Sequence, residues 1–166
     1  KFILCAAQNP CPCGFLGDSV HRCSCKQSEI DSYKRKISGP LMDRIDMQIN
    51  LSRVEFSELK TKEKGESSAA IRERVVKARL LQQERLEALG MHCNAQMGRS
   101  EVVKYCQLDA AAQNVMERYF NMLNLSARSH DRILKVARTI ADLAGSENIE
   151  AVHLAEAIQL RTSVRP

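Results

Sequence analysis

The sequence predicts a mainly α-helical protein in which two short strands flank a cysteine-rich insertion and a bundle of helices follows. The first strand is the unbroken apolar run Phe2–Ala7, which is typical of a strand buried on both faces. The second contains Met47, Ile49 and Leu51 in alternation with polar residues, the pattern of a half-buried strand. Four cysteines lie within fifteen positions between these runs, and apolar residues recur at helical spacing beyond residue 68.

Composition limits the class of protein. Apolar residues make up 44% of the 166 positions, which is typical of a globular chain and not of a disordered one. The longest apolar runs are far too short to cross a bilayer, and no secretory signal is visible, so we expect a cytoplasmic protein without membrane contact. The net charge of +5 permits a polyanionic partner without proving one. The chain starts inside a strand-like run without Met, so we interpret it as a segment of a longer protein.

A polar, glycine-containing stretch marks the best domain boundary. Residues 60–68 read KTKEKGESS and lack apolar periodicity. We therefore expect a first domain over residues 1–59, which holds the strands and the insertion, a linker over residues 60–69, and a helical domain over residues 70–166.

Capping residues delimit the expected helices. Polar residues 27–36 favour a short helix, and Gly39-Pro40 suits the start of another. The expected helices of the second part run from Ser67 or Ser68 to about Leu89, from Glu101 to Cys106 with Ser100 as cap, over about fourteen residues after Asp109, from Ser126 to Gly145, and from about Ile149 to Leu160. The Ser126 helix shows the strongest period, with Ile133, Val136, Ala137, Ile140, Ala141 and Ala144 on one face.

The cysteine cluster predicts a metal site. Cys11 and Cys13 form one C-x-C pair, and Cys23 and Cys25 form a second. Four thiolates in one loop suit tetrahedral Zn²⁺, and four protein ligands leave no open position, so we expect structural and not catalytic zinc. C-x-C is tighter than the common C-x-x-C spacing, so four metal-free or redox-active cysteines are the alternative. His21 is a possible substitute ligand.

Two polar residues next to the expected strands are candidates for contact with a phosphate. Asn9 follows the first strand, where a side chain can reach a site at the carboxyl edge of a sheet. Its simpler interpretation is a turn residue before Pro10. Arg44, in the run Leu-Met-Asp-Arg-Ile-Asp, is either a surface ion-pair residue or a charge presented to the nucleotide of a neighbouring subunit.

Two arginines open the most strongly periodic helix. Arg128 and Arg132 are four residues apart and therefore share a face. Cations near a helix N-terminus oppose the helix dipole, so the pair indicates either a solvated basic turn or a bound anion.

Several of these motifs together resemble the magnesium-chelatase-like AAA+ ATPases. They are residues 6–14 (AAQNPCPCG), the Cys23-Ser-Cys25 pair, residues 37–46 (ISGPLMDRID), residues 65–69 (GESSA) with Arg72-x-Arg74-Val75, residues 125–128 (LSAR), and residues 136–143 (VARTIADL). The four cysteines distinguish this branch from the magnesium chelatase ATPase subunit, whose corresponding loop lacks them. One departure is Gln8, where the family usually has Met.

The resemblance assigns roles to these residues. It implies that Asn9 is sensor 1, that Arg44 is the arginine finger acting in trans, and that Arg128 is sensor 2, with Arg132 in reserve. It also implies the last part of an AAA+ core with a zinc-binding insertion, followed by a helical lid. We find no G-x-x-x-x-G-K-[ST] motif, so we expect this chain alone to be inactive while the full-length protein hydrolyses ATP with Mg²⁺.

Members of this branch are similar to hexameric helicases that branch-migrate DNA during natural transformation. The resemblance thus implies a homo-oligomer that contacts branched or single-stranded DNA. Two other functions remain open: a metal-chelatase motor that remodels a partner protein, and a non-enzymatic zinc module that binds DNA or protein. The module would use the basic residues Arg72, Arg74, Lys77, Arg79 and Arg85, which otherwise form a solvated helix face.

Overall fold

The computed structural model describes residues 3–51, 54 and 65–162, and its contacts divide the chain into two units. Unit 1 comprises Lys1–Ile45 and Ser52–Glu55, and unit 2 comprises Asp46–Leu51 and Phe56–Pro166. The first half of the expected linker, residues 60–64, lies outside the described residues. Within the described ranges, helices account for all regular structure apart from one isolated parallel bridge between Leu108 and Ile149. The predicted helical character is therefore confirmed.

The two predicted strands do not form in the described residues. Residues 3–7 and 46–51 form neither a helix nor a strand, and Ile3 and Leu51 are 91% and 90% exposed. A strand exists only through hydrogen bonds to a neighbouring strand. An apolar or alternating pattern indicates which side chains could be buried in a sheet. It does not show that a neighbouring strand is present.

Unit 1 is a loop-rich region with two short helices. Helix α1 spans Gln27–Arg35 and buries Ile30. Its first turn is stabilised by Glu29, whose carboxylate accepts a hydrogen bond from the Lys26 amide at 2.8 Å. Helix α2 spans Gly39–Met42, begins with Pro at its second position, and is capped by the Ser38 hydroxyl.

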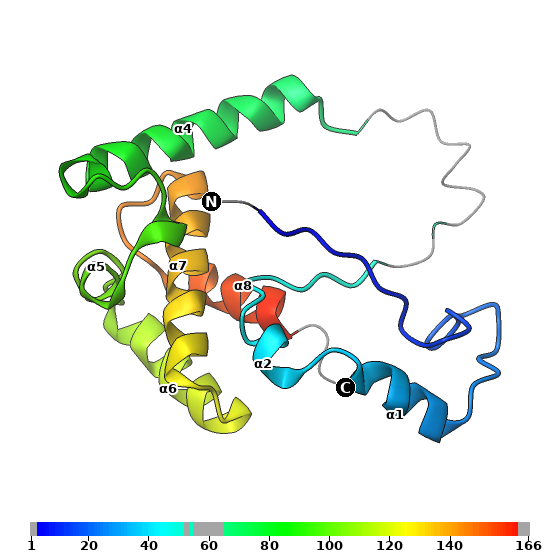
Figure 1. Ribbon diagram of the computed structural model, residues 1–166. Coiled ribbons are helices and arrows are strands. Elements are labelled where there is room, and N and C mark those ends of the chain that lie inside the picture. Colours follow the sequence, from blue (N-terminus) through cyan, green and yellow to red (C-terminus); the bar gives the residue numbers. More distant parts are fainter. Residues whose placement is uncertain (1–2, 52–53, 55–64, 163–166) are drawn as a thin grey trace. The chain divides into compact units, whose positions relative to one another are not determined.

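Unit 2 is a helical bundle built around α7 (Figure 1). Its helices are α4 (Ser68–Leu86), α5 (Arg99–Tyr105), α6 (Ala110–Leu123), α7 (Ala127–Ala144) and α8 (Ala151–Thr162), with 3₁₀ turns η1 (Glu87–Leu89) and η2 (Asn94–Gln96). Helix α7 packs against α8, α4 and α5, and α6 packs against α8. The core is made of aliphatic, methionine and cysteine side chains from all of these helices, including Leu86, Val102, Met116, Ile133, Leu154 and Ile158.

Local capping explains most of the helix ends. The side chains of Ser67, Asp109 and Ser126 accept hydrogen bonds from the first turns of α4, α6 and α7, as predicted. Helix α7 ends at Gly145, whose φ of 71° lies in the left-handed region that favours glycine. The predicted cap Ser100 is wrong: α5 begins after Gly98, because the Glu101 carboxylate accepts from the Gly98 amide at 2.7 Å.

Candidate metal centre and phosphate-facing residues

Two tight glycine turns shape the cysteine loop. The Gly14 amide donates to the Cys11 carbonyl at 3.0 Å, and the Asp18 amide donates to the Phe15 carbonyl at 3.1 Å. Each turn contains a glycine at positive φ, 84° for Gly14 and 83° for Gly17. Any other residue would be strained there, so the sequence reverses direction twice within eight residues.

These turns bring the four predicted cysteine ligands together. All four sulfur atoms lie within 4.8 Å of one another. The Sγ atom of Cys11 is 3.4 Å from that of Cys13 and 3.6 Å from that of Cys23. Tetrahedral zinc with Zn–S bonds of about 2.3 Å places its sulfur ligands roughly 3.8 Å apart. The spacing of the four thiols therefore fits one tetrahedral ion.

The thiols differ in proton affinity. Backbone hydrogen bonds with Phe15 and Ser24 lower the pKa of Cys13 to about 5. The pKa of Cys25 rises to about 12, although its backbone hydrogen bond with Cys13 lowers it, because burial and the neighbouring thiols favour the protonated form. Without a metal ion the loop therefore favours a thiolate at Cys13 and a neutral thiol at Cys25. A metal ion would replace the protons and bind all four sulfurs as thiolates.

The predicted substitute ligand His21 lies outside this sulfur cluster. Its ring packs against that of Phe15 with centroids 4.9 Å apart. The Asp18 carboxylate accepts hydrogen bonds from the backbone amides of Val20 and His21, both at 2.7 Å. Asp18 and His21 therefore help to shape the segment between the two cysteine pairs.

Asn9 is exposed and precedes this loop in unit 1. Its amide side chain lies next to Gly14, where a side-chain carbon added to the glycine would sit 3.7 Å from Asn9 Nδ2. The predicted sheet edge is absent from the described residues, so the structure leaves open whether Asn9 contacts a phosphate or is a turn residue.

Arg44 lies directly after the short helix α2. Its guanidinium Nη1 donates to the Pro40 carbonyl at 2.7 Å, so the side chain folds back on its own turn. The residue is exposed. A guanidinium stays charged at any physiological pH, and it can exchange a carbonyl partner for a phosphate oxygen when one is presented.

The two arginines of α7 differ in their surroundings. Arg128 is exposed, and its side chain makes no hydrogen bond or ion pair with another described residue. Arg132 is partly buried, and its Nη1 donates to the Asp46 carboxylate, 86 residues earlier in the chain. Among the described residues, Arg132 Nε is a buried donor without a partner. Arg128 is therefore the more available of the two for an external anion.

Comparisons with known proteins place the chain in a family. Residues 1–59 match the family model of magnesium chelatase, subunit ChlI, and residues 65–161 match that of its C-terminal region. The chain belongs to the magnesium chelatase ChlI family. The two matched regions leave only residues 60–64 between them, within the polar stretch that the sequence marks as a boundary.

Curated relatives extend along nearly the whole chain. The competence protein ComM of Haemophilus influenzae is 40% identical over 166 residues, which is 99% of this chain and 31% of ComM. The protein YifB of Escherichia coli is 37% identical over 162 residues, 97% of this chain and 31% of YifB. The chain therefore spans about a third of the length of these relatives.

A buried ionic network in this ChlI-family chain was not predicted from its sequence. Arg85 and Arg138 both donate to Asp142, at 2.6 Å and 3.0 Å, and Asn94 Nδ2 donates to the same carboxylate at 2.8 Å. Arg138 also donates to the carbonyls of residues 146 and 147, beyond the end of α7. The available signal was the pair Arg138 and Asp142, which interrupts the apolar face of α7 at helical spacing.

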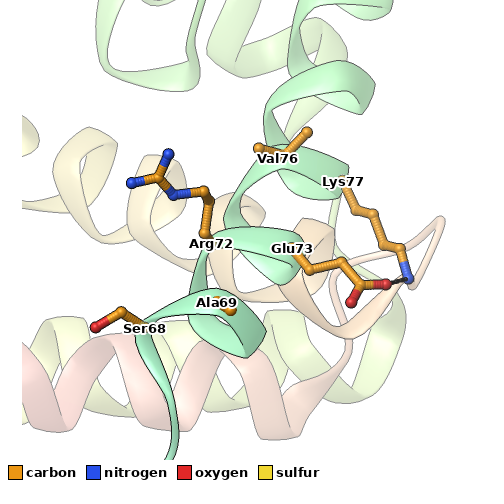
Figure 2. A pocket seen from close by; sticks show the side chains of 6 residues that line it. All are labelled: Ser68, Ala69, Arg72, Glu73, Val76 and Lys77. Atoms are coloured by element: carbon orange, nitrogen blue, oxygen red, sulfur yellow. Dashed lines mark ion pairs between the residues drawn. The ribbon is translucent and has the colours of Figure 1, made fainter.

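The basic face of α4 is mostly paired with other groups. Arg74 contacts Glu66, Lys77 contacts Glu73, and Arg85 belongs to the buried network. A shallow hollow runs along the first turns of α4 and is lined by Ser68, Ala69, Arg72, Glu73, Val76 and Lys77. Figure 2 shows the Glu73–Lys77 ion pair on one side of the helix and Arg72 extending away from it. This arrangement favours a solvated face over a basic surface for nucleic acid.

The predicted site residues are thus divided between the two units. The four cysteines and the exposed residues Asn9 and Arg44 belong to unit 1, whereas Arg128 and Arg132 belong to unit 2. No helix in the part of the chain that the structure describes is long and apolar enough to cross a membrane.

Proposed function

We propose that the chain is the part of an ATP-driven DNA motor that responds to ATP. The observation that carries the proposal is the ComM similarity, which runs through 99% of the chain and so includes both family-matched regions. The name of that relative connects it with competence, the uptake of DNA by cells. We infer that the full-length protein is a homo-oligomer, a hexamer, that uses ATP and Mg²⁺ to branch-migrate DNA during recombination.

In this proposal Arg44 acts in trans on the nucleotide of the neighbouring subunit. An arginine finger neutralises charge that develops on the transferred phosphoryl group. Arg44 suits this role because it is exposed and, among the described residues, its guanidinium is bound only by the Pro40 carbonyl on its own turn. Helix α2, which is capped by Ser38, fixes the backbone position just before Arg44.

Asn9 and Arg128 contact nucleotide as sensor 1 and sensor 2. Asn9 orients the attacking water as sensor 1, through an amide that can both donate and accept hydrogen bonds. Arg128 contacts a phosphate as sensor 2. It suits this role better than Arg132, because the Asp46 carboxylate already occupies Arg132.

The zinc ion, held by Cys11, Cys13, Cys23 and Cys25, braces the insertion between Asn9 and Arg44. With four thiolates and no open position, the ion would order the loop and take no part in hydrolysis.

The direct test replaces Arg44 in the full-length protein. We expect Arg44→Ala to lower ATP turnover by about 10³-fold or more, the range for arginine fingers, with nucleotide affinity unchanged. Arg35→Ala removes an exposed arginine from the last turn of α1 in the same unit and is the matched control. Turnover by Arg44→Ala equal to that of Arg35→Ala would refute the assignment.

A second function is favoured by the family itself. Both matched family models carry the name of magnesium chelatase subunit ChlI, which supports a motor that remodels a partner protein for metal insertion. The two functions differ in their response to DNA. We expect branched DNA to stimulate ATP turnover of the full-length protein. ATP turnover that does not change with DNA but rises when a partner protein is added would favour the chelatase-type motor.

A further inference from the structure

The contact between Asp46 and Arg132 joins two parts of the proposed mechanism. Asp46 follows Arg44 by two residues and belongs to unit 2 together with α7. Its carboxylate accepts a hydrogen bond from Arg132, which is four residues after Arg128 on the same helix. The segment that follows the proposed finger Arg44 is thus hydrogen-bonded to α7, the helix that carries the proposed sensor residue Arg128.

A second contact fixes the same segment. The Gln48 amide donates to the Leu160 carbonyl of α8 at 2.6 Å. The next residue of α8, Arg161, donates to Ser129 Oγ in the first turn of α7 at 3.1 Å. Segment Asp46–Leu51, the end of α8 and the start of α7 are therefore connected by hydrogen bonds within unit 2.

The electrostatics of α7 make the Asp46 contact sensitive to an anion. Arg128 and Arg132 are like charges at i, i+4 near a helix N-terminus, an arrangement that both their mutual repulsion and the helix dipole disfavour. Asp46 offsets this charge through Arg132. The buried Nε of Arg132 has no partner among the described residues, so the guanidinium retains donor capacity. A phosphate that binds beside Arg128 would compete with Asp46 for the same positive charge.

We propose that Asp46 is a positioning residue that communicates nucleotide occupancy at Arg128 and Arg132 to the trans finger Arg44. This inference rests on the proposed function. Two residues of chain span at most about 7 Å, so the position of Asp46 limits the positions that the Arg44 backbone can take. ATP bound at one site of the ring would in this way set the finger that serves the next site.

The test measures ATP turnover against ATP concentration in the full-length oligomer. We expect Asp46→Asn to lower kcat about five- to tenfold and to reduce the Hill coefficient toward 1, in the usual range of coupling between sites. Nucleotide affinity at single sites should stay within about twofold, because Asp46 contacts no nucleotide in this proposal. Asp46→Glu keeps the carboxylate and should restore both quantities.

Asp31→Asn is the matched control, since Asp31 is an exposed carboxylate of unit 1 that accepts a hydrogen bond from Gln27. If Asp46→Asn matches Asp31→Asn in kcat and Hill coefficient while Arg44→Ala is inactive, the coupling inference is overturned and the proposed function stands. If Arg44→Ala keeps full turnover, or the wild-type oligomer has none, the proposed function fails and the inference fails with it. Loss of helical signal in Asp46→Asn that Asp46→Glu does not restore would assign Asp46 a purely structural role and also overturn the inference.

Discussion

Arg85 on α4 and Asp142 on α7 form a two-point ion pair across 57 positions of sequence, with contacts of 2.6 Å and 3.1 Å. The Asp142 side chain is completely buried, and the neighbouring Arg138 also binds it. A buried carboxylate is tolerated only when cations and hydrogen-bond donors compensate the loss of water. The pair therefore fixes how α4 packs on α7.

Removal of this carboxylate should destabilise unit 2 strongly. Asp142→Ala leaves two arginines without their counterion, one of them buried, and we expect a loss of about 3–5 kcal/mol in the free energy of unfolding. Urea denaturation followed by the helical circular dichroism signal measures it. Asp31→Ala removes an exposed carboxylate of α1 and should change the same quantity by less than about 0.5 kcal/mol. A loss below about 1 kcal/mol for Asp142→Ala would show that the network contributes little.

Zinc binding should depend on the four clustered cysteines and on no others. We expect the purified chain to hold one zinc ion, and Cys11→Ser to lose it, because a tetrahedral site with three thiolates is incomplete. Cys93→Ser changes a cysteine outside the cluster and should retain the metal. Metal analysis of both variants measures their zinc content. Equal zinc content in Cys11→Ser and Cys93→Ser would contradict the assignment of the four cysteines as ligands.

Chelation of the zinc should leave the helices of unit 2 intact, since none of the four ligands belongs to unit 2. Hydrogen exchange at the Gly14 and Asp18 amides should accelerate, because these amides form the two turns that the ion would brace. Faster exchange throughout α7 would instead mean that the metal stabilises the whole chain.

The carboxylate of Glu101 should make the stability of α5 sensitive to acid. Its pKa is lowered by hydrogen bonds from the Ser100 hydroxyl and the Gly98 amide. A carboxylate whose pKa falls on folding stabilises the protein above its unfolded pKa, near 4.5, and loses this effect as the pH drops through the folded value. Glu101→Gln should therefore flatten the dependence of unfolding free energy on pH below about 4.5. Glu117→Gln replaces an exposed carboxylate of α6 and is the matched control.

The sequence predicts those features whose causes are local. Ser126 caps α7 and Gly145 ends it, because each effect requires only residues within one turn. The cysteine cluster was also predictable, since all four ligands come from one loop. Ser100 was the wrong cap because α5 begins two residues earlier, where the Glu101 carboxylate accepts a hydrogen bond from the amide of the N-cap residue Gly98.

Features that depend on distant residues could not be predicted. Asp46 and Arg132 are 86 positions apart, and nothing in either neighbourhood indicates the other. The same holds for Arg85 and Asp142. Residues 3–7 and 46–51 have the composition of strands, but a ladder needs a partner that these segments do not find among the described residues.

The proposed roles require Asn9 and Arg44 of one subunit to serve two different nucleotide sites. This requirement is tested most directly by mixing two full-length variants, Asn9→Ala and Arg44→Ala, each inactive alone. In mixed rings, an interface is intact when the Arg44→Ala subunit supplies Asn9 and its Asn9→Ala neighbour supplies Arg44. Random assembly of equal amounts makes about a quarter of all interfaces intact in this way. We expect ATP turnover, absent in either variant, to return on mixing. Mixtures that stay as inactive as the separate variants would contradict the assignment.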